Sequence, residues 1–365
     1  MIVTDLRIRN FRNYDQASVH FSPGLNMITG ANAQGKTNLL ESLVYLSLTR
    51  SFRISSDPVL IRNGCEFARL GCTVQDEGRS VQLEAVIHSG GKNLSVNRAA
   101  VKKTSEFVGK LNTVLFSPDD LGIFLDAPRE RRRLLDQEIT KISSGYLFAL
   151  QNYRSLLKDR NSLLKQAKRD DSYMAVLEER MIREQVTVIE WRRAFIRTIN
   201  RHLAENYRKL SGEDALVQLQ YLSCIPEQSE IEPSLKIMYD MAREKDYEFR
   251  SSTNGIHRED LAFLMNEENV IRCASQGQKR MIMLGFKMAI LRYIEEVSHK
   301  TAVLLLDDVL SELDAQRQRT LMALIQKPYQ CIITGTEIPA FLKTRDITEF
   351  KVEKGTLIQG GIAHE

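Results

Sequence analysis

The sequence predicts an α/β protein built around a phosphate-binding loop. Residues 30–37 read G-A-N-A-Q-G-K-T and match G-x-x-x-x-G-K-[ST] without a mismatch. Apolar residues at 25–29 predict a buried strand before this loop, and the helical spacing of 38–46 predicts a helix after it. The unbroken aliphatic run at 302–306 is typical of a strand buried on both faces of a parallel sheet. The loop and this strand together indicate the α/β class.

The residue types of the loop explain how it holds a triphosphate. Gly30 and Gly35 allow a tight backbone turn, so that successive N–H groups point into one nest for phosphate oxygens. The following helix presents its positive N-terminal end to the same anion. We expect Lys36 to reach the β- and γ-phosphates and the Thr37 hydroxyl to ligate Mg²⁺. The predicted loop contacts with ATP are Gly30, Ala31, Asn32, Ala33, Gln34, Gly35, Lys36 and Thr37.

Length and composition narrow the class of protein. A chain of 365 residues predicts two domains, or one domain with a large insertion. A net charge of +4 is compatible with nucleic acid and does not demonstrate it. The five cysteines form no C-x-x-C pair and lie at no zinc-ligand spacing, which favours reduced thiols. Without a signal peptide or a membrane-spanning apolar run, we expect a cytoplasmic protein that contacts no membrane.

The N-terminal third reads as strands. Alternation from residue 2 to 21 predicts two half-buried strands joined by a polar turn. A basic loop at 49–53 follows the first helix. Residues 59–100 then alternate again, and Glu77-Gly78 and Gly90-Gly91 mark turns. We expect an antiparallel sheet attached to the nucleotide-binding core, with strands at 67–74, 80–87 and 92–97.

The middle of the chain predicts long helices. From about residue 129 to 210, apolar residues recur at three- and four-residue spacing with almost no glycine or proline. Helices are expected at 145–168 and 172–208, and Asp170-Asp171 marks the reversal of a helical hairpin. Their mixed charges are typical of solvated helix faces. A strand at 217–222 and a helix at 234–249 are expected to follow.

The C-terminal third returns to the α/β pattern. A strand at 261–265 follows a polar loop, and a long apolar helix runs through 281–291. After the aliphatic strand, the last strands are expected at 330–334 and 349–354.

Two acidic residues end the aliphatic strand. Asp307 and Asp308 lie at the carboxyl end of a predicted parallel strand, where α/β folds bind their ligands. We expect Asp307 to hold Mg²⁺ through its hydration shell and Asp308 to orient or deprotonate the attacking water. Adjacent carboxylates beside a triphosphate repel unless a cation and a water engage them. Lys36 and Asp308 are therefore the predicted catalytic residues.

Two short motifs suggest that this site is only half complete. Ser275-Gln276-Gly277-Gln278 opens a helix and resembles the ATP-binding-cassette signature, whose common form is S-G-G-Q. A serine and a close-approach glycine at a helix N-terminus form a second anion site. Ser311-Glu312-Leu313-Asp314 resembles the D-loop of the same ATPases. Two separate partial anion sites suggest completion by dimerisation.

The complete set of motifs resembles the RecF family, bacterial recombination-repair ATPases related to the SMC proteins, over nearly the whole length. The matching segments are 9–14, 30–38, 116–121, 131–136, 255–260, 275–280, 305–314 and 333–336. The resemblance implies an ABC/SMC-type ATPase head with a mixed sheet, formed by 1–118 and 256–365. It implies a mainly helical lobe inserted at 119–255. Arg12, Asn13 and Asn38 join the implied ATP contacts.

The resemblance also implies a function in recombinational repair, replication and the SOS response. It implies a weak, DNA-stimulated ATPase that dimerises with ATP, with the signature acting in trans. The implied partners are DNA near single-strand gaps and the RecO and RecR proteins, which help load RecA. No base-reading motif is evident, so we expect backbone contacts to duplexes and junctions. The basic candidates are Arg50, Arg53, Lys102, Lys103, Arg129, Arg131, Arg132 and Arg133.

Departures from the general cassette pattern predict slow turnover. Gln276 stands where glycine is usual, and Asp308 occupies the position of the catalytic glutamate. No switch histidine lies in 334–336. ATP binding is therefore expected to drive a switch that slow hydrolysis resets. A nucleotide-binding subunit of another cassette system and a scaffold with little hydrolysis are the alternatives.

Overall fold

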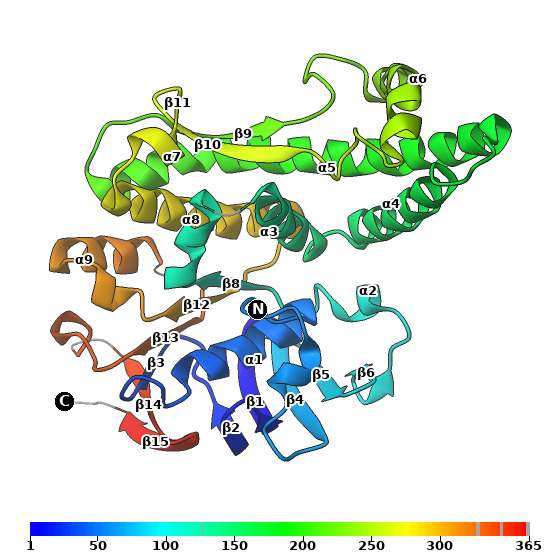
Figure 1. Cartoon of the computed structure of the whole chain (residues 1–365). Helices are drawn as coiled ribbons and strands as arrows, with labels where there is room; N and C mark the ends of the chain where they lie inside the picture. The colour runs from blue at the N-terminus through cyan, green and yellow to red at the C-terminus, as the bar shows by residue number, and fades with distance from the viewer. Residues whose placement is uncertain (126, 326–328, 344–345, 363–365) are drawn as a thin grey trace. The chain divides into compact units, whose positions relative to one another are not determined.

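The computed structural model describes residues 1–125, 127–325, 329–343 and 346–362. The chain divides into two compact units, whose elements are labelled in Figure 1. The first unit is Met1–Leu121, Glu205–Asp214 and Arg280–Glu365, and the second is Gly122–Ala204 and Ala215–Lys279. The predicted helical lobe ends at residue 255, whereas the second compact unit continues to Lys279; the domain limits of 1–118, 119–255 and 256–365 stay a prediction.

The first unit contains a six-stranded mixed sheet in the order β15-β14-β3-β13-β12-β8. The five strands from β14 to β8 run parallel, and only β15 is antiparallel, to β14. All five residues of β12 are buried, which confirms the prediction from the aliphatic run. The strand bounds are β3 (Leu25–Thr29), β8 (Thr113–Phe116), β12 (Val303–Asp307), β13 (Cys331–Gly335), β14 (Ile347–Glu353) and β15 (Thr356–Ile362).

A second, antiparallel sheet in this unit has the order β2-β1-β4-β5-β6-β7. Its side chains alternate between a buried and an exposed face, as in β1, where Leu6 and Ile8 are buried and Arg7 and Arg9 are exposed. The buried face shares one apolar core with helix α1 (Lys36–Leu48). The strands are β1 (Ile2–Phe11), β2 (Tyr14–His20), β4 (Phe67–Asp76), β5 (Arg79–His88), β6 (Gly91–Val96) and β7 (Ala99–Ala100).

The second unit is mainly helical, with a three-stranded antiparallel sheet in the order β11-β10-β9. The helical hairpin is confirmed, although its first helix ends at Leu163 rather than 168. Two helices, α5 and α8, contain residues of both units. The bounds are α3 (Pro128–Thr140), α4 (Ser144–Leu163), α5 (Asp171–Ser211), β9 (Val217–Leu222), α6 (Ile231–Phe249), β10 (Asp260–Met265), β11 (Glu268–Asn269), α7 (Val270–Cys273) and α8 (Gln276–Ser298).

The shorter connecting elements complete the chain. In the first unit these are η1 (Asp57–Leu60), α2 (Thr104–Phe107), η3 (Leu310–Glu312), α9 (Ala315–Leu324) and η4 (Ala340–Leu342); η2 (Pro118–Phe124) has residues of both units. Among the helices that the structure describes, none is long and apolar enough to cross a membrane.

Candidate nucleotide site

The phosphate-binding loop follows β3 and depends on glycine at two positions. Gly30 has φ 152° and Gly35 has φ 116°, which side chains rarely adopt. A Cβ at Gly30 would lie 2.4 Å from the carbonyl oxygen of Val352. A Cβ at Gly35 would lie 2.6 Å from Nδ2 of Asn13. Both glycines are therefore required by backbone conformation and by close neighbours.

Two turns hold the loop in place. In the turn between β1 and β2, Asn13 Nδ2 donates to the carbonyl oxygen of Gln34 at 2.8 Å. The Tyr14 hydroxyl, one residue later, donates to the carbonyl oxygen of Gly35 at 3.0 Å. From the turn between β14 and β15, the Gly355 N–H donates to the same Gln34 oxygen at 3.1 Å. Asn13, a predicted ATP contact, thus stabilises the conformation of the phosphate-binding loop.

Lys36 points into its own loop. Its ammonium donates to the carbonyl oxygens of Gly30 at 2.6 Å and Ala31 at 3.0 Å. Burial lowers the pKa of Lys36, and the carboxylates of Asp308 and Asp307 partly offset this shift. The Lys36 ammonium therefore interacts electrostatically with both carboxylates. A bound phosphate would be a stronger hydrogen-bond acceptor for it than the two neutral carbonyl oxygens.

Asp307 ends β12 beside the loop. Its Oδ1 accepts hydrogen bonds from the hydroxyls of Thr37 at 3.0 Å and Thr334 at 2.8 Å. Register explains this meeting, because Thr334 on β13 is paired with both Asp307 and Ile28 of β3. Burial raises the pKa of Asp307, and the two threonine hydroxyls partly offset the rise. A divalent cation at this position would favour the charged carboxylate.

Oxygen donors of this kind suit Mg²⁺. This ion prefers one or two protein oxygens and completes its shell with water and phosphate. The Thr37 hydroxyl and the Asp307 carboxylate supply such a pair, and the predicted metal ligands are therefore adjacent in the structure.

Asp308 has an unusual backbone and an unpaired oxygen. Its φ is 52°, in the left-handed region that aspartate tolerates better than most residues. The Asp308 N–H donates to the Thr334 hydroxyl at 3.0 Å, which fixes this conformation. Its Oδ1 is buried and has no hydrogen-bond partner among the described residues. Since a buried acceptor without a donor is costly, this oxygen fits a water molecule brought in with the nucleotide.

Arg12 and Arg53 contact residues of α1 that follow the loop. Arg12 makes two hydrogen bonds of 2.8 Å to the buried carboxylate of Glu41 on α1. Arg53 donates to Asn38 Oδ1 at 3.2 Å, and Asn38 in turn donates to Asn13 at 2.9 Å. Sequence reasoning missed Glu41, although an acid in the first helix after such a loop is a candidate partner for a nearby arginine. The ATP contact of Arg12 stays a prediction.

The signature segment caps α8 within the second unit. The Gln278 N–H donates to the Ser275 hydroxyl at 3.2 Å, and the Ser275 N–H donates to Gln278 Oε1 at 2.9 Å. This reciprocal pair is a capping box, S-x-x-Q, which fixes the first turn of the helix. Gln276 and Gly277 lie between these two residues and are exposed. The signature therefore presents a fixed helix N-terminus to solvent.

The D-loop segment lies after Asp308 in the first unit. Ser311 Oγ donates to the carbonyl oxygen of Asp308 at 2.7 Å. Asp314 caps α9 by accepting from the Arg317 N–H at 2.9 Å, an interaction that lowers the pKa of Asp314. Glu312 pairs with Arg280 at 2.9 Å. Leu313, between Glu312 and Asp314 in the sequence, is buried.

The arginines of the basic cluster on α3 serve their own unit. Arg131 makes two hydrogen bonds of 2.7 Å to Asp260 and is nearly buried. Arg132 donates to the carbonyl oxygen of Glu259 at 2.5 Å, and Arg133 pairs with Glu130 at 3.0 Å. These contacts leave few donors for DNA phosphates, whereas the other candidates are exposed: Arg50, Arg53, Lys102, Lys103 and Arg129.

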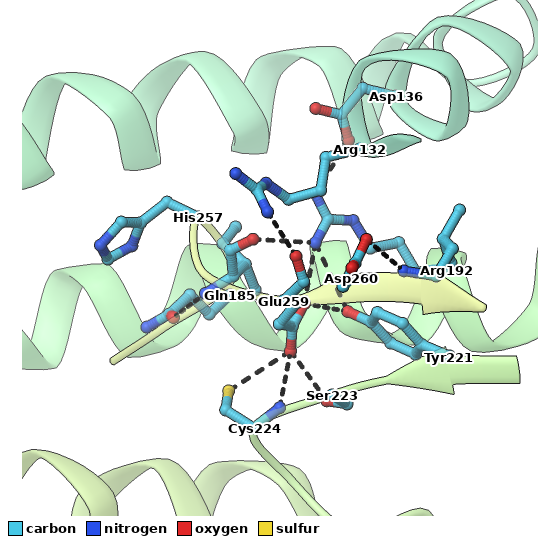
Figure 2. A network of polar contacts seen from close by, with 12 residues as sticks. Arg132, Asp136, Gln185, Arg192, Tyr221, Ser223, Cys224, His257, Glu259 and Asp260 are labelled. Carbon is cyan, nitrogen blue, oxygen red and sulfur yellow. Dashed lines mark hydrogen bonds and ion pairs between the residues drawn. The ribbon is translucent and has the colours of Figure 1, made fainter. Parts of the chain in front are cut away.

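A buried ionic network joins the segments 131–136 and 255–260 (Figure 2). Arg192 of α5 is 1% exposed and bonds Asp136 at 2.9 Å and Glu259 at 2.8 Å. Glu259 also accepts from the hydroxyls of Tyr221 and Ser223. Sequence reasoning missed Arg192, because nothing in a long charged helix separates a buried arginine from its solvated neighbours. The network ties α3, α5, β9 and the loop before β10 together.

His257 lies beside this network, between Tyr153 and the main chain (Figure 2 shows its ring). Its Nε2 lies 3.2 Å from the carbonyl oxygen of Ser252, so Nε2 carries the proton, and Nδ1 accepts from the Tyr153 hydroxyl at 2.6 Å. Burial lowers the pKa of His257 from 6.5 to about 4. The ring is therefore neutral at pH 7.

This histidine predicts a stability loss in mild acid. Below pH 6.5 the unfolded chain protonates His257 while the folded chain does not, so stability falls as the pH drops from 6.5 to about 4. The shift in the pKa of His257 corresponds to a loss of about 3 kcal/mol in the free energy of unfolding once the pH has fallen to about 4. Urea unfolding across this range should give a shallower pH dependence for His257→Asn than for the wild type. His299→Asn at an exposed site is the control; equal slopes for wild type and His257→Asn would contradict the assignment.

Known proteins resemble this chain along nearly its full length. The family model described as RecF/RecN/SMC N terminal domain matches residues 2–358. A DNA replication and repair protein RecF from Pediococcus pentosaceus is 36% identical over 370 residues, with 98% of this chain and 99% of the relative covered. A solved structure of the recombination mediator protein RecF with ATP, in the RecFOR pathway, has a TM-score of 0.90 at 31% identity, and the match covers 98% of this chain and 97% of that one. An Smc head domain from Pyrococcus furiosus, solved with a domain of ScpA, has a TM-score of 0.58 at 19% identity over 98% and 96% of the two chains, and shares the fold.

Proposed function

This chain belongs to the RecF family of SMC-type ATPases, and we propose from that premise that ATP joins two copies of it on DNA near single-strand gaps. It is an ATP-binding ATPase of recombinational DNA repair. The observation that carries the nucleotide part of the proposal is the meeting of Lys36, Thr37 and Asp307 at one loop, beside the unpaired oxygen of Asp308. The exposed, capped helix N-terminus at 275–278 supports the part played by the second copy.

Each of these residues has a role that its contacts support. Lys36 exchanges two carbonyl acceptors for β- and γ-phosphate oxygens. Thr37 and Asp307 would hold Mg²⁺, which would neutralise phosphate charge when bound. Asp308 orients the attacking water with the oxygen that lacks a donor. Because its carboxylate is one methylene shorter than that of glutamate, we expect slow hydrolysis.

A second copy completes the site in this proposal. The helix N-terminus at 275–278 is exposed and fixed by its capping box, which suits the γ-phosphate held by the other chain. The D-loop at 311–314 begins three residues after Asp308, is bonded to its carbonyl oxygen through Ser311, and would carry the state of one site toward the second copy. Binding of ATP to the loop would then lead to dimerisation.

DNA is held by its backbone rather than by its bases. The exposed basic candidates Arg50, Arg53, Lys102, Lys103 and Arg129 supply charge for phosphates of duplexes and junctions. RecO and RecR are the proposed protein partners, with RecA loading as the outcome, in the cytoplasm. Membership of the repair family argues against the transporter alternative. The scaffold alternative differs by predicting no hydrolysis.

Asp308→Asn separates the switch from a scaffold. We expect ATP binding to persist, hydrolysis to fall by about a hundredfold and the dimer to live longer, since the amide cannot take a proton from water.

Affinity for gapped, duplex and single-stranded DNA, measured with and without ATP, tests the proposed function. Normal turnover in the variant would refute the role of Asp308, and DNA affinity that ignores ATP would refute the switch.

A further inference from the structure

The exposed face of the antiparallel sheet carries four arginines around a shallow hollow. The hollow measures about 670 Å³ and is lined by β1, β2, β4, β5, β6 and the turn after β6. Arg7 and Arg9 on β1, Arg69 on β4 and Arg98 in the turn contribute positive charge. Asp5 and Glu84 are the acidic side chains of the lining. The face therefore carries a positive excess.

Two of these arginines lie directly opposite each other. Arg9 and Arg69 are register partners on neighbouring antiparallel strands. Like charges directly opposite on one sheet face destabilise the pairing. Neighbouring side chains offset this repulsion only weakly, since Arg69 lies 4.0 Å from Glu84 and Arg9 lies over the ring of Phe67 at 5.7 Å. An anion between the two guanidinium groups would relieve this repulsion.

The centre of the hollow is made by small residues. Gly71 is the register partner of Arg7 on one side and of Glu84 on the other, so no side chain fills the space between these rows. Ser18, Thr73 and Ser95 line the same surface with short polar side chains. The guanidinium groups of Arg7 and Arg98 make no hydrogen bond or ion pair among the described residues, although the charge of Arg7 helps to lower the pKa of Asp5. An anionic ligand could thus reach several guanidinium groups at once.

We propose that this face, defined by Arg7, Arg9, Arg69 and Arg98, binds the sugar-phosphate backbone of duplex DNA. The planar guanidinium fork matches phosphate oxygens in pairs, and charge complementarity is the main term in backbone binding. The lining contains no aromatic side chain, and the Phe67 ring beside it is covered by the Arg9 guanidinium, so the face offers no open stacking platform of the kind that single-strand binders use. The inference rests on the proposed DNA binding and adds a surface to it.

The double variant Arg9→Gln/Arg69→Gln tests this surface in the full chain. Affinity for a fluorescent duplex is measured with ATP over a range of salt concentrations. We expect binding about tenfold weaker at low salt, and a slope of log K against log salt that is shallower by about 1.8, since each lost phosphate contact removes about 0.9. The control Arg169→Gln/Arg183→Gln removes the same charge from exposed arginines of the second unit and should keep the slope.

The outcomes separate this inference from the proposed function. Removing the opposed pair should leave the urea midpoint no lower than that of the wild type, so weaker binding cannot come from unfolding. An unchanged slope in the double variant, with ATP-dependent binding intact in the wild type, overturns the surface alone. Equal loss in the control variant overturns it as well. Wild-type binding that depends on these arginines but not on ATP supports the surface and contradicts the switch.

Discussion

Lys36→Ala should abolish ATP-driven dimerisation. The variant loses the charge-assisted hydrogen bonds that Lys36 is placed to make with phosphates, which costs about 2–3 kcal/mol, or roughly a hundredfold in ATP affinity. It also leaves Asp307 and Asp308 without the cation whose proximity they share. Repulsion between these carboxylates and the triphosphate then opposes binding further. Analytical ultracentrifugation with and without ATP measures the effect.

Lys300→Ala is the matched control for this change. Lys300 is partly exposed and pairs with Asp76 at 3.0 Å on the surface of the same unit. Its removal should leave both ATP affinity and dimerisation unchanged, because exposed ion pairs contribute little. ATP-dependent dimers of Lys36→Ala at wild-type nucleotide concentrations would contradict the role of the loop.

Arg192→Leu should destabilise the helical unit by about 3–5 kcal/mol, the usual cost of removing one partner of a buried ion pair. Two carboxylates, Asp136 and Glu259, would remain buried without the guanidinium that both of them bind. The network in Figure 2 would also lose the bond to the carbonyl oxygen of Ile256. The midpoint of urea unfolding, followed by far-UV circular dichroism because the unit is helical, measures the loss.

Two further variants show whether charge or packing is responsible. Arg197→Leu changes an exposed arginine on the same helix and should shift the midpoint by at most about 0.5 kcal/mol. Neutralising the partners as well, in Arg192→Leu/Asp136→Asn/Glu259→Gln, should restore part of the stability, since no charge then stays buried and unpaired. A loss below about 1 kcal/mol in the single variant would contradict the account.

The elements of the fold follow from periodicity where the pattern is long. The helical spacing of α5 and the aliphatic run of β12 predict both elements correctly. Four-residue β8 and the terminal β15 were not predicted, because a short apolar run and a strand beginning at a turn carry little periodic signal. β8 nevertheless completes the parallel sheet beside β12, which only the tertiary pairing reveals.

The candidate site also contains some features that the sequence predicts and others that it does not. The loop, Thr37 and Asp307 come together as the motif spacing predicts, because motif chemistry fixes their positions at strand ends. The pairing of Arg12 with Glu41 and of Arg131 with Asp260 could not be predicted, since side-chain partners depend on tertiary contacts. The resemblance to a family identified segments 131–136 and 255–260, and the structure shows that their residues form one buried network.

The central claim is that the nucleotide site is completed by a second copy of the chain. Mixing Lys36→Ala with Ser275→Arg tests it, because each variant alone has no intact site while a mixed pair has one loop and one signature that remain whole. The account predicts that ATP hydrolysis, absent in either variant alone, returns in the mixture to at most about half of the wild-type rate, since a mixed pair holds one intact site of two. A mixture as inactive as its components would contradict completion in trans.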